Sequence, residues 1–348
     1  MEQALDRPNV GMRGKLFEGY APQFLCLFSL MLTHFLIAAH FTSRTIQDLL
    51  PLKFFGEVMV LGTLPVLALI LLCAIKITVR QIDKPTITLV RLVYSNRSWI
   101  LRSLLLFAIM LPTAQAFVAL KVAIPSIVPF YADPYLAALD RMLFLGIDPW
   151  RFTHAIFGLP ATVVIDWVYA SWGGVATAVM LWAAFDRDPQ FQIKAAFSLF
   201  LTWAVLGNAL AIALSSVGPI FYYDFYGATT FAPLMEMLPE SLILHDARNF
   251  LLESLGQGNF GSGISAAPSL HVAVTCLLFL MVRTKFRNRW VTSFAATYLV
   301  LIFIGSIHLA WHYALDGIIS LFAVPLIWRY AVRSQAQTSA SDQIQAVR

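Results

Sequence analysis

The sequence contains very little charge for its length. Aspartate, glutamate, lysine and arginine make up 12% of the 348 residues, while 59% are hydrophobic. A soluble domain carries roughly 25% charged residues. This deficit excludes an ordinary soluble domain and favours a polytopic helical membrane protein. The net charge of +5 is small, and the basic residues gather in short loops, so we expect no nucleic-acid partner.

Cysteine is also scarce, and the three cysteines, Cys26, Cys73 and Cys276, all lie inside apolar runs. Their spacing matches no metal-ligand pattern, so we interpret them as small core or lipid-facing residues. The chain lacks an evident internal repeat and any long soluble stretch between its apolar segments. A transporter built from inverted repeats is therefore not favoured.

Eight apolar runs approach the roughly 20 residues that a helix needs to cross a bilayer. The predicted fold class is an all-α polytopic membrane helical bundle of about eight transmembrane helices. The predicted spans are 22–42, 55–75, 100–122, 162–185, 193–215, 266–282, 290–307 and 311–330.

Lysine and arginine are distributed unevenly between the loops. The segment 76–102 contains six basic residues and one acid, and 283–289 contains four basic residues and no acid. With eight spans these segments and both termini fall on one side, which the positive-inside rule identifies as cytoplasmic. The loop 216–265 on the opposite side has only Arg248 against five acids.

Two connections on the non-cytoplasmic side are informative. The loop 123–161 contains five prolines and an amphipathic piece at 134–146, which we expect to lie along the interface as a short helix. The loop 216–265 includes the glycine-rich segment 256–263. Glycines there either let the backbone approach a ligand or form an ordinary flexible surface loop.

Ionisable side chains at the ends of the last three spans are functional candidates, because charge is expensive at membrane depth. His312 and Asp316 are four residues apart, which places them on one face of a helix. The carboxylate can hold one imidazole nitrogen and leave the other free to attack. His308, four residues earlier, is interpreted either as lining a site, where it would contact substrate, or as capping its helix.

A second motif lies about 40 residues earlier. Pro268 suits the first turn of a helix, because its missing N–H would be unsatisfied there. The free N–H groups that follow form an anion site, to which Ser269 adds a hydroxyl donor and His271 adds an acid for a leaving oxygen. Both motifs are predicted on the non-cytoplasmic face.

The chemistry that these residues favour is phosphoryl transfer. His312 attacks phosphorus in line and gives a phosphohistidine, Asp316 steadies its ring, and His271 protonates the departing alkoxide. Ser269 and the helix N-terminus hold the phosphoryl oxygens. No metal or other cofactor is expected, although His308, His312 and Asp316 could in principle bind a metal ion.

The motifs Ala267-Pro268-Ser269-Leu270-His271 and Trp311-His312-Tyr313-Ala314-Leu315-Asp316-Gly317 resemble those of the type 2 phosphatidic acid phosphatase superfamily. The resemblance is closest to the branch that contains inositol phosphorylceramide synthase, and it covers roughly residues 100–330. It implies the nucleophile role for His312 and the acid role for His271.

The sequence departs from the phosphatase pattern at three places. Leu270 stands where the phosphatases usually have glycine, and Gly305 and Ser306 stand where they have a Ser-Arg pair. Their first, basic motif is not recognisable. Arg248 is the candidate substitute for phosphate binding and Arg141 is a weaker one; the alternative is that Arg248 is a solvated surface residue.

These arguments divide the chain into three parts. Residues 1–99 are predicted to be a cytoplasmic N-terminus with two accessory transmembrane helices, residues 100–333 a six-helix catalytic core, and residues 334–348 a disordered cytoplasmic tail.

The expected function is that of a metal-independent lipid head-group phosphotransferase or lipid phosphate phosphatase. We expect its site on the periplasmic or lumenal side, and a bacterial inner membrane is favoured over a Golgi membrane. The expected partners are a lipid substrate and the membrane, while the oligomeric state is open. The alternative is a lipid transporter or scaffold that uses the same fold without catalysis.

Overall fold

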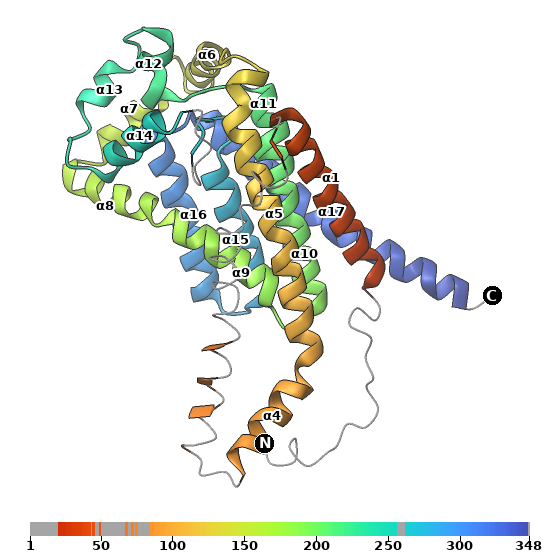
Figure 1. Cartoon of the computed structure of the whole chain (residues 1–348). Coiled ribbons are helices and arrows are strands. Elements are labelled where there is room, and N and C mark those ends of the chain that lie inside the picture. The colour runs from red at the N-terminus through yellow and green to blue at the C-terminus, as the bar shows by residue number, and fades with distance from the viewer. Residues whose placement is uncertain are drawn as a thin grey trace.

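The computed structural model describes residues 20–42, 84–255 and 262–346, isolated positions between 44 and 79, and side chains as far as 331. All regular structure in these ranges is helical, which confirms the predicted all-α fold class. Figure 1 shows the long helices packed side by side, with short helices gathered at one end of the bundle. The predicted span 55–75 and most of the glycine-rich segment 256–263 lie outside the described residues.

Six helical segments among the described residues are long and apolar enough to cross a membrane. They correspond to six of the eight predicted spans and confirm an integral membrane protein. The segments are α1 (Ala21–Thr42), α5 (Arg97–Ile127), α8 (Leu159–Ala170) with α9 (Trp172–Phe185), α10 (Pro189–Leu201) continued by the π-helix η2 (Thr202–Leu210) and α11 (Ala211–Ala213), α16 (Arg289–His308), and the apolar part of α17 (Ala314–Ala346).

The predicted span 266–282 corresponds to α15 (Leu270–Lys285), which has 16 residues. A helix of this length is about 24 Å long, shorter than the roughly 30 Å of a bilayer core. It packs against α16 and α17, and its N-cap, Ser269, is fully buried. The first turn of α15 therefore lies inside the bundle, where its longer neighbours surround it.

Helix α17 continues beyond its apolar part to Ala346. A short helix, α4 (Pro85–Ser95), precedes α5. The backbone of 334–346, which the sequence predicts to be disordered, is helical in the structure. Alanine and glutamine, which are frequent in this segment, are good helix formers, so a helix begun by apolar residues can continue through it. The division of the chain at 99 and 333 stays a prediction.

Short helices cover the end of the bundle at which α16 ends and α17 begins (Figure 1). The predicted amphipathic helix at 134–146 is confirmed as α6. The short helices are α6 (Asp133–Leu143), α7 (Pro149–Ile156), η3 (Pro219–Phe221), α12 (Tyr222–Tyr226), α13 (Ala232–Glu236) and α14 (Ile243–Glu253). A hydrophobic core that includes Trp150, Phe221, Phe231 and Tyr313 joins this cap to α8, α15, α16 and α17.

Candidate active site

The two histidine motifs meet beneath the cap. His271 lies in the first turn of α15, His312 in the loop between α16 and α17, and Asp316 in the first turn of α17. The ring centroids of His271 and His312 are 5.8 Å apart, with an angle of 60° between the ring planes. The fold thus brings together three of the predicted site residues from two segments of the chain.

Hydrogen bonds determine the tautomer of His312. Its Nδ1 lies 2.8 Å from the carbonyl oxygen of Ala266 and 3.5 Å from Oδ2 of Asp316. A carbonyl oxygen can only accept, so Nδ1 carries the hydrogen and donates it. Nε2 makes no hydrogen bond to any residue that the structure describes, and in this tautomer it carries the free lone pair. The closer partner of the ring is therefore Ala266, where the sequence indicated Asp316 alone.

Asp316 is fully buried and ties the motifs to each other. Its Oδ2 accepts a hydrogen bond from the N–H of Tyr313 at 3.0 Å. Its backbone carbonyl accepts from the N–H of Ser269 at 3.2 Å, and the hydroxyl of Ser320 donates to the carbonyl of Ser269 at 2.8 Å. The first turns of α15 and α17 are consequently held in fixed register beside His312.

Two aromatic side chains enclose the ring of His271. Tyr169 of α8 stacks on it at 4.5 Å, with 12° between the planes, and Trp172 of α9 lies 4.1 Å away at 34°. The indole N–H of Trp172 also donates to the carbonyl of His271 at 3.1 Å. These contacts fix the ring plane, while neither ring nitrogen has a hydrogen-bond partner among the described residues. His271 thus keeps both nitrogens available.

The structure adds a buried carboxylate that sequence reasoning missed, Asp133 at the start of α6. It accepts hydrogen bonds from the backbone N–H groups of Val217 and Gly218 at 2.9 and 2.7 Å. It also accepts from the hydroxyls of Tyr313 and Tyr226, both at 2.9 Å. Burial beside this carboxylate raises the pKa of both tyrosines. Asp133 therefore links Tyr313, the residue after His312, to the turn that starts at Val217.

A second carboxylate of α6 holds the start of α17. Asp140 accepts from the N–H of Ala314 at 2.7 Å and from that of Leu315 at 2.9 Å. Two free N–H groups at a helix N-terminus are suitable donors for a carboxylate. Burial raises the pKa of Asp140 to about 6. The sequence showed the amphipathic pattern of α6, but no local signal indicated that its two aspartates reach the site.

A glycine allows the chain to pass close to the His312 loop. Gly218 has φ +89°, and a Cβ at this position would lie 2.5 Å from the carbonyl oxygen of Trp311. The N–H of Ile220 donates to the carbonyl of Ala310 at 2.8 Å on the same approach. Any side chain at position 218 would therefore be strained and would push the loop that carries His312.

The other two predicted substrate-binding side chains are held elsewhere. His308 is fully buried, with Nδ1 3.1 Å from the hydroxyl of Thr153 and Nε2 2.9 Å from that of Thr162. Arg248 forms an ion pair with Asp224 and donates through Nε to the carbonyl of Ile220 at 3.3 Å. The structure does not bring either side chain into contact with His271 or His312. Their predicted roles stay predictions.

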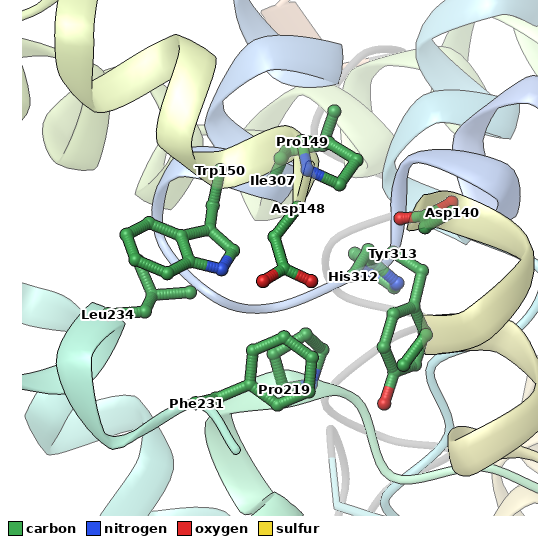
Figure 2. Close-up of a pocket in the computed structure, with 11 residues that line it drawn as sticks. Asp140, Asp148, Pro149, Trp150, Pro219, Phe231, Leu234, Ile307, His312 and Tyr313 are labelled. Carbon is green, nitrogen blue, oxygen red and sulfur yellow. The ribbon is translucent and has the colours of Figure 1, made fainter. Parts of the chain in front are cut away.

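Two hollows adjoin this part of the molecule. The one that Figure 2 shows has a volume of about 10 Å³ and is lined by His312, Asp140, Asp148 and Trp150, among others. This is roughly the volume that one water molecule needs. The second, of about 380 Å³, is lined by Arg248 and a set of largely apolar residues: Pro219, Ile220, Tyr223, Ala228, Phe231, Ala232, Met235 and Glu236. Pro219 and Phe231 line both hollows, so the larger one adjoins the side of the site on which His312 lies.

A family profile described as the PAP2 superfamily matches residues 134–329, which is more than half of the chain. The chain belongs to the PAP2 superfamily. The match contains both histidine motifs and the carboxylate Asp140, and the predicted superfamily is confirmed. Membership supports a function of the phosphatase or phosphotransferase type. No curated protein and no solved structure matches the chain.

Proposed function

We propose that the protein is a membrane-embedded phosphotransferase or phosphatase that acts on a lipid phosphate or phospho-head-group at the non-cytoplasmic face. The observation that carries this proposal is that Nε2 of His312 has no hydrogen-bond partner among the described residues, while the ring of His271, whose nitrogens also have none there, lies 5.8 Å away between centroids. Reactive imidazoles need one nitrogen fixed and the other open, and His312 has this arrangement.

The reaction proceeds in two steps on this geometry. In the first, Nε2 of His312 attacks phosphorus, the bond from phosphorus to the leaving oxygen breaks, and His271 transfers a proton to that oxygen. In the second, His271 takes a proton from water or an alcohol, whose oxygen attacks phosphorus as the bond to Nε2 breaks. The carbonyl of Ala266 and the carboxylate of Asp316 stabilise the positive charge that develops on His312.

The N-terminus of α15 supplies donors for the phosphoryl oxygens. The N–H groups of Leu270 and His271 have no acceptor among the described residues, as expected for the first turn of a helix. The hydroxyl oxygen of Ser269 accepts weakly from the N–H of Val272 at 3.5 Å, which leaves its hydrogen available to donate. These groups provide a positive field without a metal ion, so we propose a metal-independent reaction.

The position of the site supports a lipid substrate. The first turn of the short helix α15 lies within the bundle, and exposed apolar side chains cover the outside of the neighbouring helices, among them Val163, Val164 and Trp167 of α8. A head group can therefore enter from the bilayer while its acyl chains stay in lipid. We also propose the branch that contains inositol phosphorylceramide synthase, because Leu270, Gly305 and Ser306 depart from the phosphatase pattern.

The test uses purified protein in nanodiscs with lipids that carry a radiolabelled phosphate or head group. His312→Ala is expected to lower turnover by at least about a thousandfold, since covalent catalysis is lost. His40→Ala, which removes an exposed imidazole at the end of α1, is the control and should match the wild type. Acid-labile, alkali-stable label on the wild type alone would identify the phosphohistidine.

Near-normal turnover by His312→Ala would overturn the mechanism. Transbilayer movement of lipid by the wild type, kept by His312→Ala and unaccompanied by any turnover, would favour the alternative of a transporter. Activity lost with a chelator and restored by added metal would contradict the metal-independent reaction.

A further inference from the structure

We propose that the α6–α7 segment, residues 133–156, inserts the turn between its two helices into the lipid leaflet on the cap side of the membrane. The partner is the phospholipid surface itself. Acyl chains surround the apolar side chains of the turn, and lipid phosphates bind two arginines beside it. Such an anchor is independent of the proposed reaction, because it concerns how the cap contacts the bilayer.

The α6–α7 segment is tethered at both ends to helices that cross the membrane. The spanning helix α5 ends at Ile127, six residues before α6 begins at Asp133. At the other end, α7 finishes at Ile156, three residues before α8 begins at Leu159. An extended chain covers at most about 3.6 Å per residue, so both connections are short. They hold the segment close to the level at which α5 and α8 leave the bilayer, at the capped end of the bundle (Figure 1).

The turn that follows α6 exposes large apolar side chains. Leu145 is 92% exposed and has φ +59°, in the left-handed region that glycine or asparagine usually occupies after a helix. With so little of its side chain covered, Leu145 gains almost no packing within the protein to offset this strain. Other apolar side chains of the segment are exposed as well: Met142, Leu143, Ile147, Phe152 and Ile156. So many in one short segment mark a surface that contacts lipid or protein.

The exposed apolar side chains continue onto the outer side of a spanning helix. Ile156 is the last residue of α7, Leu159 is the first of α8, and Val164 lies further along α8, all three exposed. Since α8 forms the first part of the span Leu159–Phe185, its exposed apolar side chains face acyl chains. The α6–α7 segment extends this lipid-facing surface, which favours lipid over a protein partner or a second copy of the chain.

The charged side chains of the segment are divided between an inner and an outer side. Asp133 and Asp140 are buried, and the side chain of Asp148, the third and last acid, is 12% exposed. The side chains of Arg141 and Arg151 are 40% and 55% exposed. The outer side therefore combines apolar side chains with positive charge, as interfacial helices do. Arginines at this level bind the phosphates of lipid head groups.

The test measures the surroundings of single labelled positions with an environment-sensitive NBD fluorophore. The native cysteines are first replaced: Cys26→Ala, Cys73→Ala and Cys276→Ala. The label is then attached to Leu145→Cys at the turn, to Val164→Cys as the benchmark for lipid, or to Glu240→Cys as the benchmark for water. Glu240 is an exposed acid between α13 and α14 of the same cap. Each protein is placed in nanodiscs and exposed to iodide or to lipids with doxyl-labelled acyl chains.

Doxyl lipid should quench the label at position 145 at least half as strongly as the label at position 164. Iodide should quench it several-fold less than the label at position 240. A second set of variants carries the label at Met142→Cys. There, Leu145→Asp should reduce quenching by doxyl lipid at least twofold, because a carboxylate is costly to move into lipid, whereas Leu145→Phe should preserve it. Size-exclusion chromatography and thermal unfolding check that all variants fold.

Two results at position 145 would overturn the inference. One is a label that iodide quenches as strongly as at position 240 and that doxyl lipid leaves unquenched. The other is shielding from both quenchers, because a protein partner or a second copy would then cover the turn. Equal quenching by doxyl lipid in Leu145→Asp and Leu145→Phe would overturn it as well. None of these measurements needs turnover, so each outcome is distinguishable from failure of the proposed function.

Discussion

Two histidine pairs lie at the same end of the bundle, and they differ in how their nitrogens are used. His154 and His308 stack in parallel at 3.8 Å, with 16° between the planes, whereas His271 and His312 meet edge-on at 5.8 Å. In the first pair, both nitrogens of His308 contact threonine hydroxyls, and Nε2 of His154 donates to the carbonyl of His308 at 3.0 Å. In the second pair, a single nitrogen of the four is held.

Under the proposed function, this difference distinguishes a structural pair, His154 and His308, from a reactive pair, His271 and His312. Thr153 donates its own hydroxyl hydrogen to the carbonyl of Trp150, so it accepts from Nδ1 of His308, and Thr162 can donate to Nε2. A histidine whose two nitrogens are both occupied can neither attack nor exchange a proton unless a hydrogen bond breaks. Burial also lowers the pKa of His154. Proximity to the motif is therefore weaker evidence for function than a free nitrogen.

Among the variants that test this comparison, replacement of the proposed acid, His271, should lower turnover the most. His271→Asn is expected to lower turnover of a lipid phosphate by about 10²- to 10⁴-fold, since proton transfer to the leaving oxygen is lost. The loss should become much smaller with a nitrophenyl phosphate, because nitrophenolate leaves without a proton. The measurement is kcat/KM for both substrates, with His154→Asn as the matched control in the other pair.

An equal loss on both substrates would contradict the acid role of His271 and would indicate that it binds the phosphate instead. If His154→Asn also lowered kcat/KM much more for the lipid phosphate than for the nitrophenyl phosphate, the two histidine pairs would not differ in function.

A smaller effect, on stability, is expected in the structural pair. Thr162→Val removes the hydroxyl beside Nε2 of His308 and leaves a buried nitrogen without a partner, at a cost of about 1–3 kcal/mol in the free energy of unfolding. Turnover should stay within about threefold of the wild type. The control is Thr177→Val, since the hydroxyl of Thr177 is exposed and donates only to the carbonyl of Gly173 in its own helix.

Thr162→Val would contradict this interpretation if turnover fell as far as in His271→Asn while the unfolding temperature stayed unchanged. In that case His308 would belong to the substrate site, as the sequence indicated.

The sequence predicted the parts of the site that depend on short spacing. The four-residue spacing of His312 and Asp316 predicted that they lie together, although His312 lies in the loop just before α17 and not on the helix itself. Pro268 was predicted in the first turn of a helix, whereas Ser269 is the N-cap and the helix begins at Leu270. Each of these two patterns spans fewer than six residues, so it can be recognised without knowing the fold. The charge in the loops and the number of spans predicted that both segments lie at the same face, and the ring contact between His271 and His312 agrees with their lying together.

The parts that the sequence could not predict depend on contacts across the fold. Trp172 belongs to no motif in the sequence, and only the packing of α9 against α15 shows that it contacts His271. Asp140 lies 174 residues before the N–H group of Ala314 that it accepts from. Nothing in the sequence indicated that the carbonyl of Ala266 would be the nearer partner of His312.

The smallest predicted effect concerns Asp140, the carboxylate that holds the start of α17 next to the His312 loop. Its pKa of about 6 lies above the ordinary value of 3.8 because burial disfavours the ionised form. Between about pH 4 and 6 the unfolded chain has lost this proton while the folded chain retains it, so the group's contribution to stability falls as pH rises and is constant above pH 6. Asp140→Asn removes this titration, whereas the histidines titrate in both proteins.

The unfolding temperature of the wild type minus that of Asp140→Asn should therefore decrease from pH 4 to pH 6.5 and then level off. Thermal unfolding of both proteins in the same nanodiscs at half-unit intervals of pH measures it. A difference that stays flat would mean that Asp140 titrates alike in the folded and unfolded chains. A difference that grows with pH would mean that the two N–H groups of α17 outweigh burial, and that the support of His312 strengthens as the carboxylate ionises.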